Sequence, residues 1–158
     1  DLRTFLMGAS MKITVCESGT DFAKKDAPSI REPAHVAAML KDLAKSDTEF
    51  FAVLSLNQKY RLIALDVIAM GTANACIASP RDVYRTALQR NAVAVIVAHN
   101  HPSGDTTPSA EDVAVTRQTV AAGKTLEVKC LDSIIVGRTD EETPTAYSLR
   151  EAGLVEFA

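Results

Sequence analysis

Tryptophan is absent from this chain of 158 residues, and aromatic residues make up only 5% of it. The few aromatic side chains do not alternate with basic residues, as they do in grooves that bind single-stranded nucleic acid. Excess positive charge is absent as well, because the formal net charge is −3. Nucleic-acid binding depends on Lys and Arg that neutralise phosphates, so the composition gives such binding no support, although a local basic patch remains open.

Cysteine is scarce, and the three cysteines, Cys16, Cys76 and Cys130, are widely spaced. An odd number without a Cys-x-x-Cys pattern does not indicate a disulfide framework. We therefore expect buried or half-buried thiols in a reducing compartment.

Long apolar runs and a signal-peptide pattern are also missing. No run reaches the roughly 18 residues that a membrane-spanning helix needs, and the start of the chain lacks the charged and apolar regions of a secretory signal. These absences predict a cytoplasmic protein that does not interact with a membrane.

The chain contains no internal repeat, low-complexity tract or linker that would divide it. Its length and its 47% of hydrophobic residues are typical of one globular domain. Met11 could be a natural start, so the ten residues before it are interpreted as an expression remnant or a poorly ordered leader. We expect residues 1–29 to be a partly irregular leader, with a short strand at 12–16, and residues 30–158 to form the domain.

The sequence of the first half of the domain predicts a helix followed by a hairpin. The helix should begin near Pro33, a residue that suits the first helical turn. Residues 49–56 and 61–69 are predicted strands joined by a turn, and residues 73–78 are a candidate third strand. The expected core-facing stripe of the helix has the spacing i, i+3, i+4, i+7 and comprises Val36, Met39, Leu40 and Leu43.

The sequence of the second half of the domain predicts alternating helices and strands. Residues 92–98 are apolar without alternation, which is typical of a central strand covered on both faces. One helix should run from an N-cap at Ser79 to about Arg90, and a second from an N-cap at Ser109 to about Gly123. Strand 92–98 lies between them. After the second helix we expect strand residues at 125–136, broken near 130–132, and a short strand at 147–149. This order indicates an α/β fold with a mixed sheet between helices.

Three potential metal ligands follow the central strand. His99 and His101 are two residues apart, and Asp112 comes eleven residues later. Alternate residues of an extended chain point the same way, so both imidazoles can face one point, whereas Asn100 points elsewhere and could hold the loop by hydrogen bonds. Asp112, in the first turn of a helix, can turn its carboxylate back toward them. Two imidazoles and one carboxylate leave a position of a zinc ion open for water, as in a catalytic site.

Each of these residues also has a simpler explanation. A histidine is more often packed or exposed than a ligand, and we accept that interpretation for His35. Asp112 and Ser109 are well explained as capping residues of the same helix, because Ser109 suits the N-cap and Asp112 the first turn. Spacing and placement alone leave metal binding and these simpler explanations both open.

A resemblance to a known family favours the metal site. The stretch from His99 to Asp112 closely resembles the signature of the RadC-like branch of the JAB/JAMM (MPN-type) zinc metallopeptidases, which is a Glu, then His-x-His-Pro, then Ser-x-x-Asp. The resemblance covers about residues 30–155. It implies a cytidine-deaminase-like three-layer α/β/α sandwich with a mixed β-sheet. Further matching blocks are residues 49–56, Gly71-Thr72, residues 79–83 and residues 148–154.

The resemblance also implies roles for individual residues. His99, His101 and Asp112 would bind Zn2+, with water as the fourth ligand. Ser109 would donate a hydrogen bond to the oxyanion of the tetrahedral intermediate, and Glu49 would act as general base on the zinc-bound water. The alternative interpretation is that Glu49 is an ordinary charged residue at a strand edge. Weaker candidates for the base are Asp47 and Asp66.

The resemblance implies that the protein is a zinc-dependent metallohydrolase of peptidase or isopeptidase type. Such an enzyme would cleave an amide bond in a protein or peptide substrate. One alternative is a DNA-repair or DNA-processing factor of the RadC type without peptidase activity. Another is an inactive scaffold, against which the complete set of ligands argues. The oligomeric state stays open, because an exposed strand edge could pair with another chain.

The sequence departs from the family pattern in three respects. Asp132-Ser133 stands where relatives commonly have Asp-His, and Met70 stands where Arg is frequent. We expect both differences to alter substrate contacts or packing and to leave the zinc ligands intact. The residues before the domain are too few for the helix-hairpin-helix region of many relatives, which weakens an inherited DNA-repair role.

Overall fold

The computed structural model describes residues 2–7, 11–16, 27–71, 78–139 and 143–157. Its main element is a five-stranded mixed sheet in the order β4-β3-β5-β6-β7, in which only β5 and β6 run parallel. The strands are β3 (Glu49–Leu56), β4 (Leu62–Gly71), β5 (Ala94–Asn100), β6 (Lys129–Arg138) and β7 (Pro144–Ser148). The predicted hairpin of two strands around residues 57–60 is confirmed, since β3 and β4 pair antiparallel.

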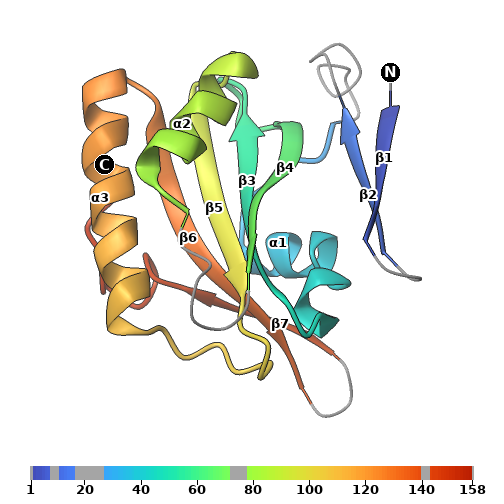
Figure 1. The fold of residues 1–158 in the computed structure, drawn as a ribbon. Helices are drawn as coiled ribbons and strands as arrows, with labels where there is room; N and C mark the ends of the chain where they lie inside the picture. The colour runs from blue at the N-terminus through green and yellow to red at the C-terminus, as the bar shows by residue number, and fades with distance from the viewer. Residues whose placement is uncertain (1, 8–10, 17–26, 72–77, 140–142, 158) are drawn as a thin grey trace.

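Helices cover both faces of this sheet (Figure 1). On one face, α1 (Pro33–Met39) and the short 3-10 helix η2 (Leu43–Lys45) share an apolar cluster with the sheet. On the other face lie α2 (Pro80–Gln89) and α3 (Ala110–Leu126), which share a second cluster with it. The predicted α/β class, with a three-layer α/β/α arrangement around a mixed sheet, is confirmed.

The central position of β5 follows from its lack of polar alternation. Ala94, Ile96 and Ala98 belong to the cluster on the α1 face, whereas Val95 and Val97 belong to the cluster on the α2 and α3 face. All of these residues are buried, because both faces of the strand are covered. Pairing with β6 is parallel and needs a crossover, which α3 provides.

The predicted break near residues 130–132 is a bulge within a continuous strand. Val95 pairs with Cys130 but Ile96 pairs with Asp132, so Leu131 is the extra residue of β6. The buried carboxylate of Asp132 accepts hydrogen bonds from Ser148 Oγ and the backbone N–H of Ser133. Burial of Asp132 raises its pKa, although these hydrogen bonds oppose the shift. The polar residue thus marks an irregular register and not a strand end.

The prediction that α3 ends near Gly123 is wrong, because the helix continues to Leu126 and is followed by Glu127 in a left-handed conformation with φ of 57°. Gly123 serves close packing instead of termination. A Cβ atom there would lie 2.2 Å from the hydroxyl of Tyr84 in α2 and 2.5 Å from the carbonyl oxygen of Val128. The same hydroxyl donates a hydrogen bond to the carbonyl of Thr119, so α2 and α3 approach each other closely at this point.

The helix at Pro33 begins as predicted but is shorter than its apolar pattern suggests. It ends at Met39, and a 3-10 turn follows at Leu43–Lys45. Met39 is therefore 36% exposed, which corrects its predicted place in the core stripe, whereas the other three members of that stripe are buried. The predicted N-caps of α2 and α3 are confirmed, because Ser79 and Ser109 accept hydrogen bonds from the backbone N–H of Asp82 and Asp112.

The described residues of the N-terminal segment form two strands. Residues Leu2–Met7 (β1) and Met11–Cys16 (β2) pair as an antiparallel two-stranded sheet, which confirms the strand expected at 12–16. The candidate strand at 73–78 lies outside the described residues except for Ala78.

The structure bears on the expectations about membrane-spanning helices and about cysteines. Among the described residues, no helix has the length and apolar character needed to cross a membrane. Cys130 is a buried free thiol, and burial raises its pKa to about 12. The side chain of Cys16 and the whole of Cys76 lie outside the description.

We predict that Gly123→Ala destabilises the fold by about 1–3 kcal/mol, the range for overpacking a filled site. The sign is informative, because alanine in a helix interior is ordinarily about 1 kcal/mol better than glycine. Urea unfolding measures the change, with Lys124→Ala at an exposed neighbouring position as control. A Gly123→Ala protein more stable than wild type would show that α2 and α3 do not approach so closely.

Candidate metal centre

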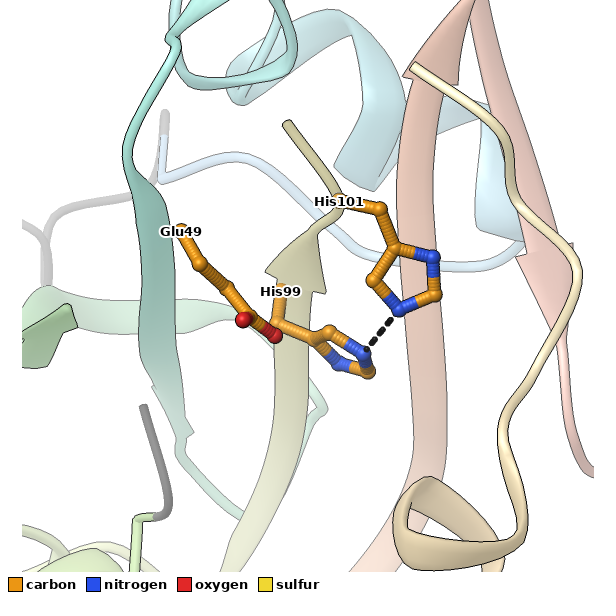
Figure 2. Close-up of side chains that lie close together, drawn as sticks. All are labelled: Glu49, His99 and His101. Carbon is orange, nitrogen blue, oxygen red and sulfur yellow. Dashed lines mark hydrogen bonds between the residues drawn. The ribbon is translucent and has the colours of Figure 1, made fainter. Parts of the chain in front are cut away.

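The carboxyl end of β5 presents two imidazoles to the same point. His99 is the penultimate residue of β5 and is only 5% exposed, and His101 follows directly after the strand. Their Nε2 atoms lie 3.2 Å apart (Figure 2). The alternation of β5 directs His99 to the face of α3, since Val95 and Val97 lie on that face.

Asp112 in the first turn of α3 completes this convergence. Its Oδ1 atom lies 3.0 Å from His99 Nε2, and its Oδ2 atom lies 3.3 Å from His101 Nε2. The capping box fixes the carboxylate, because Oδ2 also accepts a hydrogen bond of 2.7 Å from the backbone N–H of Ser109. Asp112 is therefore both a capping residue and a member of the cluster.

The charges in this cluster respond to one another. Burial alone would raise the pKa of Asp112, but hydrogen bonds from His101 and His99 hold it well below its ordinary value. The hydrogen bond with Asp112 raises the pKa of His101. The ionised carboxylate of Asp112 thus favours a positive charge on His101, as it would favour a cation bound at the same point.

Glu49 approaches the histidines from the neighbouring strand. It is the first residue of β3, and one of its carboxylate oxygens lies within 4.8 Å of a ring nitrogen of His99 and of His101. Figure 2 shows the Glu49 carboxylate beside the His99 ring. Desolvation raises the pKa of Glu49, and the two histidines partly oppose this shift. The site thus includes a half-buried carboxylate beside the two imidazoles.

Neighbouring groups orient both imidazole rings. The Nδ1 atom of His101 lies 2.9 Å from the carbonyl oxygen of Asp105, which fixes the Nε2 atom toward the cluster. The side chain of Asp105 accepts hydrogen bonds from the backbone and hydroxyl of Thr107, so the loop supports itself. His99 stacks on Phe51 with an interplanar angle of 6°. Its Nδ1 atom is buried without a hydrogen-bond partner among the described residues.

Gly137 of β6 allows the loop after His101 to lie close to the sheet. A Cβ atom at Gly137 would lie 2.4 Å from the carbonyl oxygen of Gly104 and 2.5 Å from the Cγ2 atom of Thr106. Gly104 itself has a φ of 80°, a conformation that side chains disfavour. Gly137 was not among the residues predicted from the sequence, although a glycine inside a strand is a known indication that another backbone approaches closely.

The donor set fits a small divalent cation. Tetrahedral zinc with bonds of about 2.0–2.1 Å to nitrogen and oxygen places its ligand atoms about 3.3 Å apart. The three contacts among His99, His101 and Asp112 measure 3.0–3.3 Å. Glu49 offers a fourth group at a longer range. The side chains thus meet at separations that one zinc ion can bridge.

Other candidate residues lie elsewhere or have another partner. Asp66 forms a two-point ion pair with Arg90 of α2, with contacts of 3.0 and 2.6 Å. Asp47 is exposed. His35 pairs with Glu32 at 3.1 Å on the surface of α1. Asn100 holds β3 by its side chain and not the loop that follows His101, which corrects our expectation for it.

We predict that Asp112→Asn destabilises chelator-treated protein more at pH 6 than at pH 8.5. A raised folded-state pKa lets protonated His101 stabilise the fold below its unfolded pKa of about 6.5, and this contribution is lost as pH rises through the folded value. Thermal melting at the two pH values measures the difference.

The matched control is Asp82→Asn, at the same position of α2, where the carboxylate has a lowered pKa and no histidine beside it. Asp82 is ionised at both pH values, so its substitution should cost the same at each. Equal losses for Asp112→Asn at pH 6 and pH 8.5 would contradict a charged contact between His101 and Asp112.

Comparison with known proteins finds similar sequences. The family model of the RadC-like JAB domain matches residues 30–154. A UPF0758 protein of Chloroflexus aggregans is 37% identical over 155 residues, which cover 94% of this chain and 66% of that protein. A UPF0758 protein of Caldanaerobacter subterraneus is 40% identical over 130 residues, covering 82% of this chain and 54% of the relative. One from Moorella thermoacetica is 45% identical over 109 residues, 68% of this chain and 48% of the relative.

The chain spans about half to two thirds of the length of these relatives. The family match covers most of the chain, including Glu49, the paired histidines and the start of α3. The JAB domains are broadly a superfamily of metallohydrolases, and the described residues include a cluster able to hold a metal ion. This chain belongs to the family of RadC-like JAB domains.

Proposed function

We propose that this domain is a zinc-dependent hydrolase that cleaves an amide bond, either a peptide or an isopeptide bond, in a protein or peptide substrate. The observation that carries the proposal is the convergence of His99, His101 and Asp112 at 3.0–3.3 Å with Glu49 beside them. The half-buried carboxylate of Glu49 supplies the acid–base group that such a hydrolysis needs beside the metal ligands.

His99, His101 and Asp112 would hold the zinc ion. When bound, zinc would lower the pKa of a water molecule toward neutrality and polarise the carbonyl group of the substrate. The chain contributes the rigid placement of its ligands, because β5 fixes His99 and the capping box fixes Asp112.

Glu49 would move the proton. Burial raises its pKa, so the carboxylate has a greater affinity for a proton than an exposed glutamate, while the histidines keep that shift in check. It would accept the proton from the attacking water and return it to the amine that leaves. Its place at the start of β3 puts this carboxylate on the same side of the sheet as His99 (Figure 2).

Ser109 would stabilise the negative charge that develops on the carbonyl oxygen of the substrate. Its Oγ atom accepts the N–H of Asp112 at 3.1 Å, and a hydroxyl that accepts one bond still has a proton to donate. Such a donor is worth a few kcal/mol of barrier in hydrolases with an oxyanion hole.

We predict that Glu49→Gln keeps about one zinc per chain but lowers hydrolysis at least about 100-fold, the lower range for loss of a general base. Zinc should remain because three other groups hold it. Metal analysis and turnover of a library of quenched fluorogenic peptides and lysine-linked isopeptides measure the two effects. The control is Asp47→Asn, two residues away and exposed.

Wild-type protein without zinc at neutral pH, or without hydrolysis of any member of the library, would contradict the proposed function. Salt-dependent binding of duplex DNA in an electrophoretic shift assay would then favour the DNA-processing alternative. Normal turnover by Glu49→Gln would instead place the base at another residue.

We predict that Ser109→Ala lowers the rate of hydrolysis about 10-fold or more and changes zinc affinity much less, because loss of one oxyanion donor costs rate above all. Ser79→Ala is the matched control, since Ser79 caps α2 through the same contact with the third residue of its helix. Both variants should lose about 1 kcal/mol of stability. A loss of zinc affinity without a loss of rate would leave Ser109 with its capping role alone.

A further inference from the structure

Asn100 lies between the two histidines in the sequence but faces the opposite side of the sheet. Ala94, Ile96 and Ala98, which share its parity in β5, belong to the apolar cluster on the α1 face. Its side chain is 1% exposed. Asn100 is thus buried behind the metal centre and does not reach a substrate on the side of His99.

The amide of Asn100 bonds to the backbone on either side of Glu49. Its Oδ1 atom accepts a hydrogen bond of 2.8 Å from the N–H of Phe50, and its Nδ2 atom donates one of 3.1 Å to the carbonyl of Thr48. One partner is a donor and the other an acceptor, so only one orientation of the amide satisfies both. The two bonds hold the peptide groups that flank Glu49.

These bonds extend the pairing of β3 and β5 beyond its backbone ladder. The antiparallel register runs from Leu56 and Ala94 to its last pair, Phe51 and His99. Glu49 lies two residues past that last pair, at the start of β3, where its backbone pairs with Gly71 of β4 but no longer with β5. The Asn100 side chain provides the next connection between the two strands.

We propose that Asn100 is a positioning residue that sets the distance between the Glu49 carboxylate and the metal ion. The inference deepens the proposed function and rests on it. Asn100 acts from the rear face of the sheet, through the backbone of residues 48 to 50, while Glu49 extends from the front face toward His99. Aspartate could not replace it fully, because a second carboxylate oxygen would face the carbonyl of Thr48.

Cobalt-substituted protein tests the inference without a known substrate. The visible absorption bands of bound Co2+ are recorded against pH, and the midpoint of their change reports on charged groups near the ion. Loss of the Glu49 carboxylate in Glu49→Gln should move this midpoint by about half a pH unit or more. Asn100→Ala should move it in the same direction, because the carboxylate drifts away from the ion.

The decisive measurement is the double variant. If Asn100 acts only through Glu49, then Asn100→Ala should leave the midpoint unchanged once Glu49 is Gln. The matched control is Asn57→Ala, at the opposite end of β3, where the side chain accepts the N–H groups of Lys59 and Arg61 at 2.9 and 3.1 Å. This variant also loses two backbone contacts of an asparagine but should not move the midpoint.

Asn100→Asp keeps the inference testable if Asn100→Ala does not fold. It retains the acceptor for Phe50 and loses the donor to Thr48, so it should move the midpoint with Glu49 present. Its added charge acts equally in the Glu49→Gln background, and the comparison of the two backgrounds removes that effect.

The possible failures are distinguishable. Wild-type protein that binds neither Zn2+ nor Co2+ would overturn the proposed function and this inference with it. Metal binding with an unmoved midpoint in Glu49→Gln would remove Glu49 from the site. A midpoint that moves in Glu49→Gln but not in the Asn100 variants, or that the Asn100 variants move equally in both backgrounds, would overturn the positioning role alone.

Discussion

The pairing of β5 with β3 on one side and β6 on the other is the constraint on which the rest of the site depends. β5 is apolar on both faces, so the fold can bury it only at the centre of the sheet. Its carboxyl end then lies among the ends of the neighbouring elements, and its last residues cannot move independently of the core. The sheet therefore holds the backbone of a histidine at this position rigidly, as a metal centre with precisely placed ligands requires.

The site brings two imidazoles so close together that a neighbouring anion has to stabilise any positive charge on them. Two imidazoles with Nε2 atoms 3.2 Å apart cannot both be charged without an anion close by. Asp112 supplies that anion, and the N-terminal end of α3 and its capping box favour the ionised form. The capping contact is thus part of the electrostatics of the centre, since the helix start and the metal site share one carboxylate.

Local sequence signals predicted most elements, because capping, turn formation and apolar patterning act within a few residues. Ser79, Ser109 and the apolar run of β5 illustrate this. The errors arose where tertiary packing decides. Gly123 suggests a helix end in isolation, but the hydroxyl of Tyr84, 39 positions earlier in the sequence, occupies the space that a side chain would need. Met39 fits a helical stripe, but the helix ends before that stripe is complete.

In the candidate site, too, the residues that are close in sequence could be predicted from local patterns, whereas those far apart in sequence could not. His99, His101 and Asp112 lie within fourteen residues, so spacing alone could suggest that they meet. Glu49 is 50 residues from His99, and only the resemblance to a family indicated it. The bond that joins Phe50 to Asn100 spans the same separation.

Such contacts depend on strand register, which a local pattern does not specify. A shift of one residue between β3 and β5 would turn Glu49 to the rear face and Asn100 away from its partners. The register of one antiparallel pair therefore determines whether the carboxylate and the histidines face the same point, and the Asn100 amide secures that register where the ladder ends.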